Sequence, residues 1–292
     1  MIVKLVCNPV FSNSLKLKGN SSMKKSEYTF LSSRLVRQCM AAISLLALLI
    51  SSAASADEAD AKRLLKEMSD YLAGQTYISF NYDSTLEVVT PDDQVLGLAS
   101  SGTLSMARPG SIRATRSGGF ADVEMNFDGT TFTIFGKNMN AYTQVEIPGD
   151  IDNVVNKLRE DYGRPLPAAD LLTTDAYDAL MADVTDIKDL GSGVVDGVEC
   201  DSLAFRKPEV DFQIWIAQGD ARYPCKYVIT SKKVANGPQY SVQVSHWKTG
   251  AAVEKIDYTF KNSTNADKVD LKDLKDAGDL PDNFVMITGE SE

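Results

Sequence analysis

The sequence predicts an α+β fold, in which one large, strongly curved antiparallel β-sheet carries helices on one of its faces. Apolar and polar residues alternate through most of residues 78–262, as in strands with one buried and one exposed face. Residues 57–75 and 150–182 instead repeat their apolar residues at a helical period. The apolar stripes of these helices can cover the apolar side of the sheet.

The first helical stretch, residues 57–75, ends near Gly74, a favourable residue just after a helix. Its apolar residues fall at positions i, i+1, i+4, i+7 and i+8, which places them on one stripe. This stripe consists of Leu64, Leu65, Met68, Tyr71 and Leu72. We therefore expect the helix to pack against the sheet through this stripe.

Six strands are expected between this helix and residue 145. Turns at residues 91–93 and 108–110 separate some of them, and Asp128-Gly129 is the strongest hairpin signal in the chain. In the first strand the apolar residues occupy even positions and polar residues occupy the odd positions between them. The apolar set is Ile78, Phe80, Tyr82, Leu86 and Val88.

A helical insert over residues 150–182 interrupts the strands. Its first part has an apolar stripe, and a second helical stretch in two pieces follows Pro167, with Thr173 and Thr174 as N-caps. The stripe consists of Ile151, Val154, Val155 and Leu158.

Strands then resume to about residue 262, so we expect one domain over residues 57–262. Residues 263–292 are polar and acidic and are expected to form a partly ordered tail. One late strand has Tyr240, Val242, Val244 and His246 on its apolar side, which predicts a core or rim position for His246. The strand series is expected to close with Ile256, Tyr258 and Phe260.

Residues 1–56 have the three parts of a secretory signal peptide. Basic residues precede the apolar run 40–50, and small residues up to Ala56 follow it. The run is shorter than the roughly 20 apolar residues that span a bilayer. We expect cleavage after Ala56 and export to the periplasm of a Gram-negative cell. Met23 followed by two lysines looks like the ordinary start of a signal peptide. Either the start of the chain is assigned too early, so that residues 1–22 are not translated, or these residues are a cytoplasmic extension.

Charge and composition narrow the classes of function. Residues 1–56 hold seven of the 30 basic and one of the 40 acidic residues, so the remaining chain has 23 basic and 39 acidic residues and a net charge of −16. Such a chain repels nucleic acid and anionic surfaces. His246 is the only histidine, which leaves too few candidates for a histidine triad or a typical zinc site. We expect no enzyme activity, cofactor, metal or nucleic-acid partner.

Two parts of the chain resemble known families. The run from Gly102 through Arg108-Pro109-Gly110, followed by Asp128-Gly129, resembles the periplasmic lipoprotein carriers and their outer-membrane receptors, which share the LolA/LolB-like fold. Residues 198–230, which include Val-Asp-Phe-Gln-Ile-Trp-Ile, resemble a family of predicted periplasmic proteins of unknown function with this fold. Together these likenesses cover roughly residues 60–262.

The resemblance implies an unclosed β-barrel whose apolar concave face is capped by helices and holds acyl chains. In the carriers, the arginine of the Arg-Pro pair hydrogen-bonds to the lid helices; Arg108 matches it here, although a solvated turn arginine is the alternative. Arg113 and Arg116 stand where the carriers often have aromatic residues, which implies a more polar rim. The side chains expected to line the cavity, or else to form a close-packed core, are Phe80, Tyr82, Met106, Met125, Phe127, Phe132 and Phe212.

Cys200 and Cys225 are the two cysteines that remain after cleavage. An oxidising compartment favours a disulfide between them. A simple meander of three strands would place them two strand spacings apart, about 9.5 Å, which is beyond disulfide reach. A bulge or another strand order would bring them together, so both states stay open.

Two functions from different classes fit these observations. The first is a periplasmic binding protein that holds a lipid, an acyl chain or a lipoprotein in a helix-capped half-barrel, gated by residues 150–182. The second is an interaction or regulatory protein that binds an inner- or outer-membrane protein through a strand edge or its acidic face, without cargo.

Overall fold

The computed structural model describes residues 57–119, 121–162 and 168–274. The predicted signal peptide, its cleavage after Ala56 and the last part of the tail lie outside the described residues. Within them, no helix combines the length and the apolar character that crossing a bilayer requires.

Twelve strands and a few helices make up the described parts of the chain. The strands before the insert are β1 (Tyr77–Val89), β2 (Val95–Ala107), β3 (Ser111–Gly118), β4 (Asp122–Phe127), β5 (Thr131–Gly136) and β6 (Ala141–Glu146). The later strands are β7 (Asp186–Val195), β8 (Val198–Arg206), β9 (Val210–Ala217), β10 (Pro224–Ser231), β11 (Gln239–Thr249) and β12 (Asp267–Lys268). The helices are helix 57–73, α2 (Ile151–Glu160), α3 (Ala176–Met181) and the 3-10 turns η1 (Ala169–Leu172), η2 (Gly250–Ala252) and η3 (Leu271–Asp273).

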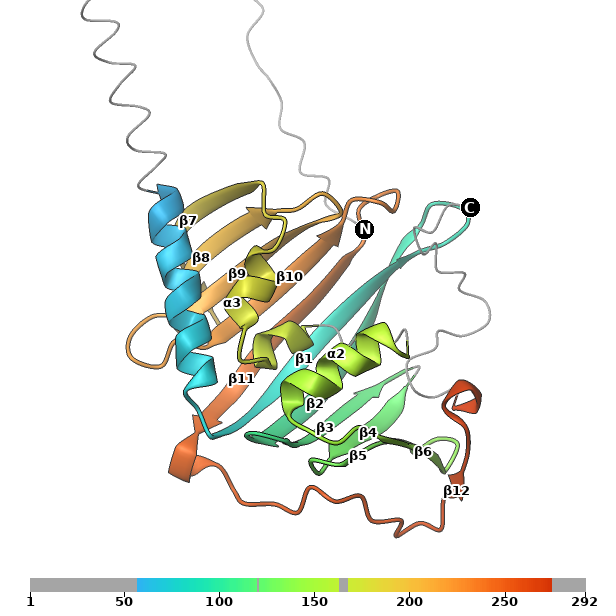
Figure 1. The fold of residues 1–292 in the computed structure, drawn as a ribbon. Coiled ribbons are helices and arrows are strands. Elements are labelled where there is room, and N and C mark those ends of the chain that lie inside the picture. Colours follow the sequence, from blue (N-terminus) through green and yellow to red (C-terminus); the bar gives the residue numbers. More distant parts are fainter. Residues whose placement is uncertain (1–56, 120, 163–167, 275–292) are drawn as a thin grey trace, which may run out of the picture. The chain divides into compact units, whose positions relative to one another are not determined.

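All twelve strands belong to one sheet, in the order β12-β6-β5-β4-β3-β2-β1-β11-β10-β9-β8-β7. Neighbouring strands are antiparallel except β12, which runs parallel to β6. β12 and β7 lie at opposite ends of this order, so the sheet does not close (Figure 1). The predicted α+β class, with one large and mostly antiparallel unclosed sheet, is confirmed.

Helix 57–73, α2, η1 and α3 lie on one face of this sheet, called the inner face below (Figure 1). The predicted stripe of helix 57–73 is confirmed: Leu65, Met68 and Leu72 are essentially inaccessible to solvent, and Tyr71 is half-buried. α2 likewise buries all four residues of its predicted stripe, and the Asp150 side chain caps it by accepting a hydrogen bond from the Asn153 backbone N–H at 2.8 Å. Both stripes join one continuous core with the inner face.

Cross-strand pairing arranges the inner-face side chains in rows. One row crosses five strands in the core and consists of Ile78, Met106, Ile112, Phe127 and Phe132. Two rows further along β1, Tyr82 pairs with Gly102, and Gly102 pairs with Arg116. The Tyr82 ring lies across Gly102, and its hydroxyl donates a hydrogen bond to the Thr115 carbonyl at 2.8 Å. A side chain at residue 102 would occupy the space of this ring.

A β-bulge gives His246 an orientation that differs from the predicted one. The pairing of β1 with β11 shifts register between Ser79 and Asn81, and His246 adopts a left-handed backbone with φ +54°. This shift exposes His246 and turns the neighbouring Trp247 toward the inner face, opposite to strict alternation. The predicted core position of His246 is therefore wrong.

Two further expectations need correction. Residues 253–266, with Ile256, Tyr258 and Phe260, form no strand. Thr173 and Thr174 are not helix N-caps; the hydroxyl of Thr173 donates to the Asp170 carbonyl, and that of Thr174 to the Asp152 carboxylate. In the described part of the tail, β12 pairs with β6, and Leu274 is fully buried.

Replacing Gly102 by alanine is expected to lower the free energy of unfolding by about 1–3 kcal/mol. The new Cβ would lie 2.0 Å from the Thr115 carbonyl oxygen and 2.6 Å from the Tyr82 ring, so the backbone or the ring must move. Gly193→Ala on β7 is the matched control, because its Cβ would approach Trp215 no closer than 3.6 Å. Urea unfolding of both variants measures the difference, and equal losses would contradict this account of Gly102.

Candidate functional site

The helices over the inner face are joined to one another by polar contacts. The Tyr177 backbone N–H of α3 donates to the Ser69 hydroxyl of helix 57–73 at 3.0 Å. Arg159 of α2 forms an ion pair with Asp170 of η1. The carboxylate of Asp152 in α2 also accepts a hydrogen bond from the backbone N–H of residue 174 at 3.1 Å. Helix 57–73 and the described parts of the insert therefore form a connected layer.

Arg108 attaches this layer to the sheet at the turn between β2 and β3. Its Nη2 donates to the Leu172 carbonyl at the end of η1 at 2.8 Å, and to the Leu72 carbonyl near the end of helix 57–73 at 3.5 Å. Burial lowers the pKa of Arg108, and its Nε is buried without a hydrogen-bond partner. One guanidinium thus bridges two helical segments and the sheet, which is the geometry a latch requires.

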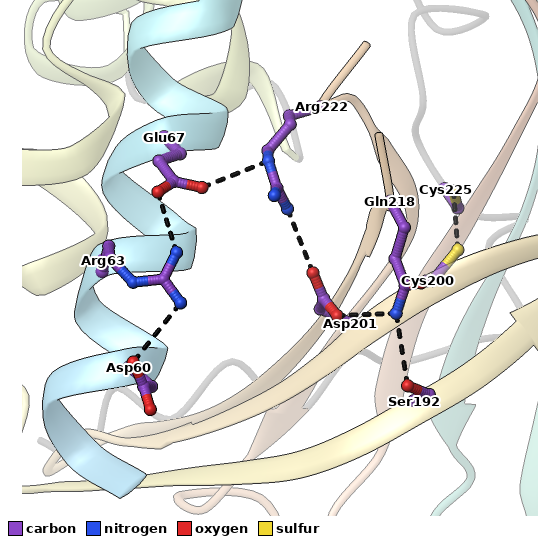
Figure 2. Close-up of polar contacts among 9 residues, drawn as sticks. All are labelled: Asp60, Arg63, Glu67, Ser192, Cys200, Asp201, Gln218, Arg222 and Cys225. Carbon is purple, nitrogen blue, oxygen red and sulfur yellow. Dashed lines mark hydrogen bonds and ion pairs between the residues drawn. The ribbon is translucent and has the colours of Figure 1, made fainter. Parts of the chain in front are cut away.

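Arg222 forms a second link between helix 57–73 and the sheet, as Figure 2 shows. Its Nε lies 3.1 Å from a Glu67 carboxylate oxygen on the helix, and its Nη1 lies 3.1 Å from an Asp201 oxygen on β8. Glu67 is also paired with Arg63 at 2.8 Å on its own helix. Alternating charges therefore run from the helix surface to the sheet.

The Arg222 link continues to the edge of the sheet. Asp201 accepts a hydrogen bond from Gln218 at 2.8 Å, and the same amide nitrogen lies 3.2 Å from the Ser192 hydroxyl on β7 (Figure 2). Sequence reasoning missed this network, because Glu67 and Arg222 carry no motif and lie 155 positions apart.

The seven side chains predicted to line a cavity all occupy or border the core of the inner face. Phe80, Tyr82 and Met125 are half-buried and pack against the core from its border. The other four are at most 5% exposed and are Met106, Phe127, Phe132 and Phe212. A role as ligand contacts stays a prediction for all seven.

An aromatic stack lies between helix 57–73 and the sheet. The Trp247 ring is stacked between Tyr223 and Phe80, with ring centroids 4.9 Å and 5.4 Å apart. Its Nε1 also donates to the hydroxyl of Tyr71 on the helix at 3.2 Å. The bulge in β11 places Trp247 here, so strand periodicity could not reveal this contact.

The two arginines of the predicted polar rim lie on opposite faces of β3. Arg113 is exposed on the outer face and pairs with Glu124 at 2.9 Å. Arg116 is half-buried on the inner face, in the row of Tyr82 and Gly102. A polar depression of about 450 Å³ also crosses the central strands, with Asp83 and Lys226 among its lining residues. None of the seven predicted cavity residues lines it.

Cys200 and Cys225 lie in a small apolar cluster of their own, and their Sγ atoms are 2.9 Å apart. The strands β8, β9 and β10 do form the expected meander. A bulge between Pro224 and Lys226 shifts the register at Cys225, and Cys200 pairs with the small Ala217 of β9. The sulfurs therefore meet across β9, where a regular meander would separate them.

A family model described as "Predicted periplasmic protein (DUF2092)" matches residues 61–272. The description gives a cell compartment and no activity. In the described residues, no group of three or more His, Cys, Asp or Glu side chains is arranged to hold a metal ion. No match was found among curated proteins.

Several solved structures show a distant likeness. The lipoprotein LppX of Mycobacterium tuberculosis is 14% identical with a TM-score of 0.44, over 69% of this chain and 100% of LppX. A chain of the MucA/MucB complex of Pseudomonas aeruginosa is 17% identical with a TM-score of 0.38, over 67% of this chain and 59% of the matched chain. A LolA superfamily protein of Nitrosomonas europaea is 10% identical with a TM-score of 0.32, over 68% of this chain and 97% of that protein. At these scores the likeness supports no conclusion about function.

We propose that Cys200 and Cys225 form a disulfide by exchange with a disulfide reagent such as oxidised glutathione, which accepts their two electrons and two protons and leaves as two thiols. Burial raises the pKa of both thiols, so the reactive thiolate is scarce near pH 7. Oxidation by oxidised glutathione should therefore become faster from about pH 7 to about pH 9. Mass spectrometry after alkylation measures the bridge, and Cys225→Ser is the control. A wild-type chain that stays fully alkylatable would contradict the proposal.

Proposed function

This chain belongs to the DUF2092 family of predicted periplasmic proteins, and we propose that it is an exported binding protein for an apolar chain. The ligand would be a lipid, an acyl chain or a lipoprotein, held between the helices and the inner face. The proposal includes export by the signal peptide in residues 1–56, with cleavage after Ala56, and residence in the periplasm.

The observation that carries this proposal is that the apolar inner face extends beyond the described helices that cover it. Leu86 of β1 pairs with Leu98 of β2 and with Tyr240 of β11, and all three are half-buried. In Figure 1 the far ends of β1 and β2 carry no described helix over them. Apolar surface of this kind is a suitable place for an acyl chain, which contributes about 0.8 kcal/mol for each methylene that it buries.

The way in which the cover is attached suggests how a ligand would enter. The insert contacts the sheet through apolar side chains and a small number of hydrogen bonds. Arg108 supplies one of these bonds, and Lys207 supplies another by donating to the Ala179 carbonyl of α3 at 3.2 Å. We propose that the described residues 151–160 and 169–181 move as the gate, with Arg108 as its latch. Half-buried Phe80, Tyr82 and Met125 would then contact the chain nearest to the core.

The proposed function predicts that the mature protein, isolated from the periplasm without detergent, carries a lipid or acylated molecule. Native mass spectrometry would measure a discrete added mass, and solvent extraction would identify it. Delipidated protein is expected to take up a fluorescent fatty acid. A cargo-free mass, together with no uptake of added lipid, would contradict the binding function.

Arg108→Met is expected to release bound fatty acid several-fold faster than wild type, because the carbonyls of Leu72 and Leu172 lose their donor. Arg113→Met is the matched control, since Arg113 lies on the outer face of the adjoining strand. Stopped-flow release of the fluorescent fatty acid compares the two variants. Equal release rates in wild type and Arg108→Met would argue against the latch.

A second candidate function is supported by the edge strand β7. It pairs only with β8 in the described sheet, and it exposes Leu190 and Val194 by 50% and 69%. An open edge with apolar side chains can accept a strand from another protein. In this function a membrane protein would bind β7 without transfer of cargo.

This second function predicts that the cargo-free protein cosediments with membranes of its own cell, and that Val194→Lys abolishes the association. Val95→Lys on β2 is the control, because Val95 is also exposed, by 40%, on a strand with two neighbours. Equal binding of Val194→Lys and wild type would exclude β7 as the contact.

A further inference from the structure

Arg116 is a cation on the mainly apolar inner face. It alternates along β3 with Ala114, which is buried in the core, and it pairs across the sheet with the buried Val123 of β4. Its other neighbour in the row is Gly102, over which the Tyr82 ring lies. Arg116 therefore lies at the border between the core and the end of β1 and β2 that no described helix covers.

The Arg116 guanidinium has no partner among the described residues. It forms no ion pair there, and its Nε is buried without a hydrogen bond. The other arginine of the same strand, Arg113, is paired with Glu124, so an unpaired arginine is not a general feature of this strand. A buried donor without an acceptor is unfavourable and marks a place where a bound group can supply one.

The surroundings of Arg116 restrict what that group could be. Tyr82 and Tyr240 are close enough for the arginine charge to influence both hydroxyls, and burial raises the pKa of each, to about 12 for Tyr82. Both therefore remain neutral near pH 7. The next rows along β1 contain first the hydrogen-bonded pair Ser84 and Ser100, and then the apolar Leu86. A single cation thus lies beside polar hydroxyls and next to apolar surface.

We infer that Arg116 binds the anionic head group of an amphiphile whose apolar chain lies along the inner face. A planar guanidinium binds carboxylate and phosphate oxygens through parallel N–H donors. The net charge of −16 on the chain after residue 56 disfavours anions over most of the protein, so an anion is held only where a cation lacks an acidic partner. This inference rests on the proposed binding function and specifies its ligand class.

The test uses three amphiphiles that share one alkyl chain: laurate, dodecyl phosphate and dodecanol. Displacement of a neutral fluorescent probe from the mature protein measures their affinities below the micelle concentration. Wild type is expected to bind the two anions about tenfold to a hundredfold more tightly than the alcohol. Arg116→Gln should lose this preference and still bind dodecanol, and Arg113→Gln should keep it. If Arg116→Gln weakens the binding of laurate alone, the head group is a carboxylate. If it weakens the binding of dodecyl phosphate alone, the head group is a phosphate.

Other outcomes would overturn the inference. If Arg116→Gln keeps the preference for anions, or if Arg113→Gln loses it equally, Arg116 does not bind the head group, while dodecanol binding would leave the proposed function intact. If wild type binds none of the three, both the proposed function and this inference fail. Thermal unfolding separates a structural role: a lower melting temperature for Arg116→Gln with equal weakening of all three ligands would also overturn the inference.

Discussion

The burial of helical apolar stripes on the inner face is the interaction on which the rest of the structure depends. Helix 57–73 and α2 bring two stripes into one core with rows of side chains from the sheet. Burial of this kind is strong but has no preferred direction. The position of the cover is therefore defined by directional contacts at its margins. Arg108, Arg222 and Lys207 provide them, each from the sheet or its turns to a helix.

Much of this architecture could be predicted because periodicity reports burial directly. The even positions of β1, the stripe of helix 57–73 and the stripe of α2 all agree with the pattern in the sequence. The prediction for His246 failed because one extra residue enters its strand, and a bulge also decides the cysteine contact that the sequence left open. At β11 a bulge exchanges the orientations of His246 and Trp247, and at β10 a bulge brings Cys225 to Cys200. No local pattern announces a bulge, because it depends on the partner strand.

The candidate site illustrates the same limit for charged residues. Arg108 could be identified because its Arg-Pro motif resembles a family pattern. Glu67 and Arg222 could not, since their contact exists only once the helix has docked on the sheet. Arg116 has no partner among the residues that the structure describes, and only its three-dimensional neighbours can establish this. The periodicity of the sequence thus indicates which face a side chain occupies. Only the folded structure shows which charged side chains lack a partner of opposite charge.

The pairing of β1 with β11 has a consequence for how the chain reaches its native state. β1 to β6 follow one another in the sheet as they do in the chain, and so do β7 to β11, which progress across the sheet in the same direction. The seam between these two meanders joins residues roughly 160 positions apart, such as Tyr82 and Val244. Contacts of such long range close slowly, because they require a large loss of chain entropy first. During synthesis from the N-terminal end, one edge of β1 therefore stays unpaired until β11 has been made.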